Sequence, residues 1–179
     1  MSKLLQLVLI SLLLPVAGQA ADPFVPDELQ GWRAWVLEGK KYRDCPFFFN
    51  RAAATEGDFV CAWPGSLDLT VTANGGRFTQ QWTVYVDEQW LPLPGDGSYW
   101  PHQVTANGRA IEVVLHDGVP SLLVGPGNYR LAGSFEWDER PGILSIPPQS
   151  GLVALSVNGQ RVARPELTGA GVFLGERRR

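Results

Sequence analysis

Residues 67–86 read LDLTVTANGGRFTQQWTVYV, and this stretch decides the fold. Apolar residues alternate with polar ones before and after the central Asn74-Gly75-Gly76 segment, which is the period of a half-buried β-strand. That apolar set is Leu67, Leu69, Val71, Phe78, Trp82, Val84 and Val86. Gln80 is the polar exception on the same face. Because Asn and Gly tolerate the positive φ of a tight turn, the stretch predicts an antiparallel hairpin with one buried face.

The same alternation of strands and turns continues downstream. The turn signals are Asn107-Gly108, Asp117-Gly118, Gly125-Pro126-Gly127 and Asn158-Gly159. The first three predict a hairpin meander that includes a strand at 109–116 and a last strand at 128–137. Residues 89–103, rich in Pro, Gly and Trp, are predicted to form a long loop over one end of the domain.

Residues 67–176 are therefore predicted to form one domain of about seven to nine short strands. Such a series is typical of an all-β fold, an antiparallel β-sandwich or a related barrel. An α/β fold is disfavoured, because parallel strands need crossovers of about a dozen or more residues and no such segment lies between 67 and 160.

The first twenty residues have the layout of a signal peptide. Lys3 supplies positive charge, an apolar stretch follows from Leu4 to Leu14, and Gly18 and Ala20 fit the small-residue cleavage positions. Removal of residues 1–20 would leave a chain without a second membrane-spanning segment. The sequence thus predicts an exported protein in the periplasm or outside the cell.

Residues 21–66 are predicted to hold one short amphipathic helix and a disulfide-closed loop. The helix begins at Pro26 or Asp27, ends at Gly39, and carries Leu29, Trp32, Trp35 and Val36 at helical spacing. Cys45 and Cys61 are the only cysteines, and an even count in an exported protein favours a disulfide. Residues 177–179, three arginines, are predicted to be a solvated basic tail.

Charge and composition disfavour several classes of partner. The formal net charge is −3, which provides no large positive field for nucleic acid or an anionic membrane surface. No motif indicates a cofactor. A metal site is also disfavoured, because zinc needs about four ligands and only His102 and His116 could add to the two cysteines.

The titratable residues show no catalytic motif. Neither histidine lies in a nucleophile motif, so a Ser-His-Asp triad is not indicated. Carboxylates that could form a glycosidase pair lie at predicted strand ends or in loops, where solvated turn charges are the more common case. They are Asp87, Glu88, Asp96, Glu136, Asp138 and Glu139. The chain is accordingly predicted not to be an enzyme.

Seven tryptophans are the most unusual feature of the composition. Trp82 and Trp137 lie on alternating apolar faces and are predicted to fill the core. Indole rings suit both core filling and stacking on a sugar or protein surface. Four aromatic residues near prolines or turns are candidates for an exposed binding rim, with capping of the core as the alternative. They are Trp63, Trp90, Tyr99 and Trp100.

Several landmarks follow one another in a specific order: CAWPGSLDLTV, FTQQWTVYVDEQWLPLPGD, WPHQVTANGRA, GNYRLAGSFEW and LVALSVNGQRV. This order resembles the N-terminal region of long exported envelope proteins of Gram-negative bacteria, to which no activity is assigned. The resemblance spans nearly the whole chain after residue 20. It implies that the chain is a fragment or one module of a larger envelope protein, and it transfers no catalytic residue.

The leading hypothesis for function is a non-catalytic periplasmic or envelope β-sandwich module for protein interaction or structural support. The alternative is a carbohydrate-binding module in which Trp90, Tyr99 and Trp100 form a stacking platform. The expected partner is thus an envelope protein or a glycan. A hydrolase using loop carboxylates such as Asp96 is the third hypothesis.

Overall fold

A computed structural model describes residues 26–36, 38–48, 52–53 and 55–175. The predicted signal peptide and the basic tail lie outside these residues. The chain divides into two units, one ending at Glu38 and one comprising Gly39–Arg179. The first unit contains α1 (Asp27–Val36), whose first turn carries Asp27 and Glu28, a favourable placement beside the positive end of the helix dipole.

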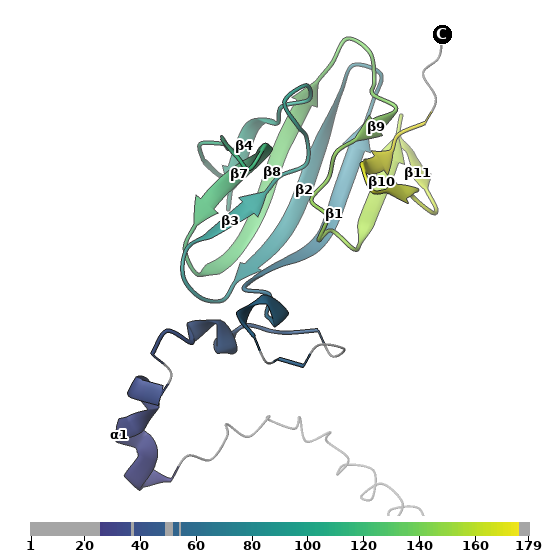
Figure 1. Cartoon of the computed structure of the whole chain (residues 1–179). Coiled ribbons are helices and arrows are strands. Elements are labelled where there is room, and N and C mark those ends of the chain that lie inside the picture. Colours follow the sequence, from purple (N-terminus) through teal and green to yellow (C-terminus); the bar gives the residue numbers. More distant parts are fainter. Residues whose placement is uncertain (1–25, 37, 49–51, 54, 176–179) are drawn as a thin grey trace, which may run out of the picture. The chain divides into compact units, whose positions relative to one another are not determined.

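The second unit is built almost entirely of strands (Figure 1). Its described 3₁₀ helices are η1 (Lys41–Asp44) and η2 (Glu56–Asp58). Its described strands are β1 (Ala62–Val71), β2 (Gly75–Val84), β3 (Gln89–Pro92), β4 (His102–Ala106), β5 (Arg109–Ala110), β6 (Val114–His116), β7 (Val119–Val124), β8 (Gly127–Glu136), β9 (Ile143–Leu144), β10 (Val153–Val157), β11 (Gln160–Val162), β12 (Leu167–Thr168) and β13 (Gly171–Phe173).

The strands form two layers. One layer is a seven-stranded sheet in the order β11-β10-β1-β2-β8-β4-β5. The other layer consists of two three-stranded sheets, β3-β7-β6 and β12-β13-β9. The Gly95 N–H donates to the Ser145 carbonyl at 2.8 Å and joins the end of β3 to the end of β9. The predicted class, an all-β and predominantly antiparallel sandwich, is confirmed.

The core lies between the layers and follows the period-two pattern of the sequence. The buried residues of the large sheet include Leu67, Leu69, Val71, Phe78, Trp82, Val84, Leu131 and Phe135. The small sheets contribute Leu91, Leu122, Val124, Leu144 and Val172 to the same cluster. Trp82 and Trp137 are both buried, as predicted. Burial of one face of every long strand against the other layer is the main stabilising term.

Close contact between β2 and β8 explains the glycine in the apolar face of β8. Phe78 pairs with Gly133, and a Cβ at Gly133 would lie 2.5 Å from a Phe78 ring atom. Gly75 likewise has no room for a Cβ, which would lie 2.6 Å from the Phe135 carbonyl oxygen. The glycines after Asn74 therefore allow the approach of β8, whereas the sequence predicted that they would supply positive φ.

The other two-residue turns match their predicted chemistry. Both residues of Asn107-Gly108, Asp117-Gly118 and Asn158-Gly159 have positive φ. That is the backbone conformation of a type I′ hairpin turn, which Asn, Asp and Gly adopt at least cost.

The predicted meander is wrong beyond its individual hairpins. β7 and β8 do not pair, and Gly125-Pro126-Gly127 carries the chain from one layer to the other. The reason is that β8 already pairs with β2 over its whole length on one side and with β4 on the other. The expected strand at 109–116 is likewise split into β5 and β6, which belong to different layers.

Two further details differ from the sequence prediction. The expected loop at 89–103 begins with β3 and ends with the first residues of β4. β1 and β10 form a parallel pair, with Leu69 opposite Leu155. Here the connection between the parallel strands is the greater part of the domain itself, so no helical crossover is needed.

Candidate functional site

The predicted disulfide is present, and an aromatic cluster lies close to it in sequence. Cys45 and Cys61 are bonded, with their Cα atoms 4.9 Å apart and a sequence separation of 16. The Phe59 ring contacts the rings of Tyr42 and Phe47, with centroids 5.2 and 5.6 Å away. Because Phe47 also pairs with Phe59 through an isolated β-bridge, the covalent link and the rings hold this loop together.

The four aromatic residues of the predicted rim have different neighbours. Trp63 lies on β1 with its ring 5.5 Å from Phe48, and Trp90 lies on β3 with its ring stacked on His116. Tyr99 packs edge-to-face on the buried Trp137. Trp100 is half-buried, two residues before β4 begins.

These residues do not form one rim. Trp63 pairs with Thr83 at one end of β2, and Trp137, the partner of Tyr99, follows the residue that pairs with Gly75 at the other end. A strand of ten residues spans about 33 Å. Tyr99 therefore caps the core far from Trp63, which is the alternative that the sequence left open.

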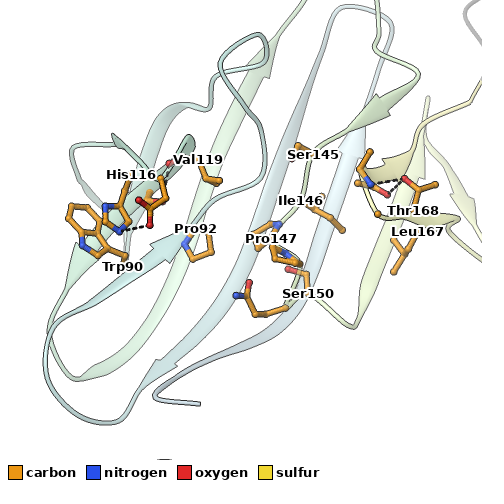
Figure 2. Close-up of a pocket in the computed structure, with 17 residues that line it drawn as sticks. Trp90, Pro92, His116, Val119, Ser145, Ile146, Pro147, Ser150, Leu167 and Thr168 are labelled. Carbon is orange, nitrogen blue, oxygen red and sulfur yellow. Dashed lines mark hydrogen bonds and ion pairs between the residues drawn. The ribbon is translucent and has the colours of Figure 1, made fainter. Parts of the chain in front are cut away.

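Trp90 instead borders a groove that sequence reasoning missed. The groove has a volume of about 650 Å³, within the range of small-ligand pockets. Its walls come from four segments: Trp90 and Pro92 on β3, residues 116–121 of the β6–β7 hairpin, residues 145–150, and residues 167–171 of the β12–β13 hairpin. Figure 2 shows Trp90 and His116 on one side, Ser145 to Ser150 in the middle, and Leu167 and Thr168 opposite.

The groove is a gap in the outer layer of the sandwich. β3 ends its small sheet, and the Gly95–Ser145 bond places the 145–150 segment along the free side of β3. Beyond this bond, Pro147 and Pro148 cannot supply the N–H groups that would continue the pairing. The layer therefore opens between β3 and residues 146–150, and the outward-facing residues of β3 line the opening.

The Trp90 ring is held in place by its neighbour. The imidazole of His116 stacks on it with centroids 4.2 Å apart and planes 13° from parallel. His116 Nε2 lies 3.4 Å from the Asp117 carboxylate in the adjoining turn. His116 covers one face of the Trp90 ring. Trp90 nevertheless remains 37% exposed and lines the groove, so the part of the ring that His116 leaves free is a positioned aromatic surface.

Buried hydroxyl groups supply the polar part of the groove. Ser121 is 2% exposed and donates to the Val119 carbonyl at 3.0 Å. Ser150 is 3% exposed and accepts a hydrogen bond from Nε2 of Gln80 at 2.8 Å. Gln80 is the polar exception in the core face of β2, and its position is explained by this bond. Apolar walls with a few fixed polar groups are typical of ligand sites.

The candidate catalytic groups are dispersed, and Asp87, Asp96 and His116 have structural partners. Asp87 pairs with Lys41 on the surface at 2.9 Å. Asp96 accepts hydrogen bonds from the N–H groups of Ser98 and Tyr99 at 2.8 and 3.0 Å, so it shapes its own turn. His102 is on β4 of the large sheet and His116 is on β6 of a small one.

No group of three or more His, Cys, Asp or Glu side chains in the described ranges is placed to hold a metal ion. None of the helices in the same ranges has the length and hydropathy of a membrane span.

Comparison with known proteins adds little. No family model matches the chain, and no curated protein matches it. Among solved structures, a two-domain M1 zinc metallopeptidase bound to L-tryptophan aligns with 51% of this chain and 30% of its own, at 14% identity and a TM-score of 0.30. This chain thus spans less than a third of that protein's length, and a similarity this weak supports no inference about function.

Proposed function

We propose that this chain is a non-catalytic binding module of the cell envelope, exported by residues 1–20 and acting as part of a larger envelope protein. Its binding site is the groove between β3 and residues 145–150. The observation that carries the proposal is the groove itself, in which a fixed aromatic ring and buried hydroxyls line a space of about 650 Å³.

The composition of the groove lining supports binding over hydrolysis. Of the residues that line it, only His116 and Asp117 are titratable, and they are adjacent in one turn. Glycoside hydrolysis uses two carboxyl groups on opposite sides of the scissile bond, about 5 to 9 Å apart. The groove lining contains one carboxyl group, that of Asp117. Its other polar groups are hydroxyls and an amide, which orient a ligand but do not transfer protons at neutral pH.

The disulfide supports action outside the cytoplasm. Disulfides persist in oxidising compartments, and the Cys45–Cys61 bond closes the loop that precedes β1.

Site-specific photocrosslinking in intact cells tests the proposal. A benzophenone amino acid replaces Leu167, an exposed residue of the groove wall, in the full chain with its signal sequence. The matched control carries the same group at Leu115, which is also exposed and does not line the groove. We expect a crosslinked product from position 167 and none from position 115. Equal yields at both positions, or no product at 167, would refute a binding site in the groove.

A further inference from the structure

The free edge of β3 offers hydrogen-bond acceptors to the groove but very few donors. The Leu93 N–H bonds to the Pro120 carbonyl on β7, and in an antiparallel pair the bonding residues alternate. Leu91 and Gln89 therefore face β7, and the backbone groups of Trp90 and Pro92 face away from it. Pro92 has no N–H, and Pro94, next in the alternation, has none either.

This edge cannot pair with an added strand. Strand addition needs alternating N–H and C=O groups along the edge, and here only the Trp90 N–H could donate. The Trp90 and Pro92 carbonyls remain as acceptors. Proline on an edge strand is a known protection against pairing with another chain. A protein partner binding as an extended strand is thus disfavoured, and a ligand rich in hydroxyl donors fits.

The remaining polar groups also suit a hydroxyl ligand. The Ser121 hydroxyl donates its hydrogen bond to the Val119 carbonyl, so its oxygen lone pairs remain as acceptors. Ser150 receives the Gln80 amide on its oxygen, and no described residue accepts its own proton. A hydroxyl group both donates and accepts, so it can pair with either serine.

The charge of the groove argues for a neutral ligand. His116 and Asp117 are adjacent at one end of the groove, with the imidazole 3.4 Å from the carboxylate. The other residues that line the groove are uncharged. A polyanion or a polycation would lose hydration there without gaining a counter-charge.

We propose that the groove binds a neutral glycan segment. One sugar ring packs against the part of the Trp90 ring that His116 leaves free, and its hydroxyls donate to the Trp90 and Pro92 carbonyls and pair with Ser121 and Ser150. This inference rests on the proposed function, since it names the ligand of the same groove.

Titration calorimetry with cellohexaose, maltohexaose and chitohexaose tests it on the purified, disulfide-bonded chain. We expect at least one hexaose to bind, with a Kd that changes less than about twofold across a tenfold range of salt, because a neutral ligand gains nothing from unscreened charge. Trp90→Ala is expected to weaken that binding about tenfold, the equivalent of one aromatic contact. Trp63→Ala is the matched control, because Trp63 is also 37% exposed but lies outside the groove, and its Kd should not change.

Three results would overturn the inference: no binding by any of the three hexaoses at millimolar concentration, a Kd that Trp90→Ala leaves unchanged, or a Kd that Trp63→Ala raises as much as Trp90→Ala does. The crosslinked product from position 167 separates this failure from that of the proposed function. If the mass added by crosslinking is labelled after periodate oxidation and survives protease digestion of the chain, the glycan is supported. If the added mass is itself digested by protease, the partner is a protein, which overturns the glycan but keeps the binding module. No product overturns both.

Discussion

Loss of the Ser150 hydroxyl should destabilise the whole domain, although Ser150 lies at the groove. Among the described residues, its oxygen accepts the only hydrogen bond of the buried Gln80 side chain, and Gln80 Oε1 has no partner there. Gln80 is 1% exposed. Ser150→Ala therefore leaves an entire amide buried and unsatisfied, which costs about 1 to 3 kcal/mol.

Urea unfolding with the disulfide intact measures this loss of unfolding free energy. In thermal unfolding, a loss of about 2 kcal/mol corresponds to a decrease in Tm of about 4 to 8 °C for a domain of this size. Ser145→Ala, in the same segment, is the control, because its side chain makes no hydrogen bond to a described residue. Its expected cost is below about 0.5 kcal/mol.

A double-mutant cycle isolates the cause. Gln80→Met keeps the volume of the side chain and removes both polar atoms, so we expect it to be neutral or stabilising. In the Gln80→Met background, Ser150→Ala should cost much less than in the native chain. The reasoning is refuted if Ser150→Ala costs less than about 0.5 kcal/mol alone, or if its cost is the same in both backgrounds.

Three further changes have expected outcomes. Gly133→Ala should destabilise the domain by about 1 to 3 kcal/mol in thermal unfolding, because its Cβ would overlap the Phe78 ring. Adding Phe78→Leu to Gly133→Ala should recover part of that loss. Equal stability of Gly133→Ala and the native chain would contradict this expectation. Replacement of Cys45 and Cys61 by Ala should cost about 3 kcal/mol, the chain-entropy value for a loop of this length, in urea unfolding; a loss below about 1 kcal/mol would argue against a stabilising loop closure. Asp96→Ala should cost about 1 kcal/mol through its two backbone hydrogen bonds, and Asp96→Asn less, since the amide oxygen still accepts; an equal loss in both variants would show that the turn does not depend on these bonds.

Local sequence predicted the elements of this fold better than their arrangement. The period-two runs and the turns at Asn107, Asp117 and Asn158 are local features, and the structure has a hairpin at each. Which layer a strand joins depends on partners far away in sequence. β8 pairs with β2, about 50 residues earlier, and this leaves no edge of β8 for β7. A meander was the simplest prediction from consecutive turns, but it does not consider that β2 and β7 compete for the edge of β8.

The sequence anticipated only one residue of the proposed binding site, for the same reason. Trp90 was identified because exposed indole rings are recognisable in a sequence, and the grouping with Tyr99 and Trp100 assumed that near neighbours in a loop are neighbours in space. The groove instead joins segments from 90 to 171. Short polar residues such as Ser121 and Ser150 carry no signal until the fold brings them together.

One signal in the sequence did point to the groove. The run Leu91-Pro92-Leu93-Pro94 was interpreted as a loop because prolines break strands. Its leucines are nevertheless fully buried at alternate positions, which is strand behaviour. Both observations hold together only if each missing N–H faces away from the neighbouring strand, and this occurs at the edge of a sheet. Alternating leucine and proline therefore predicts an edge strand beside an opening that no further strand can fill, and in this molecule that opening is the proposed binding site.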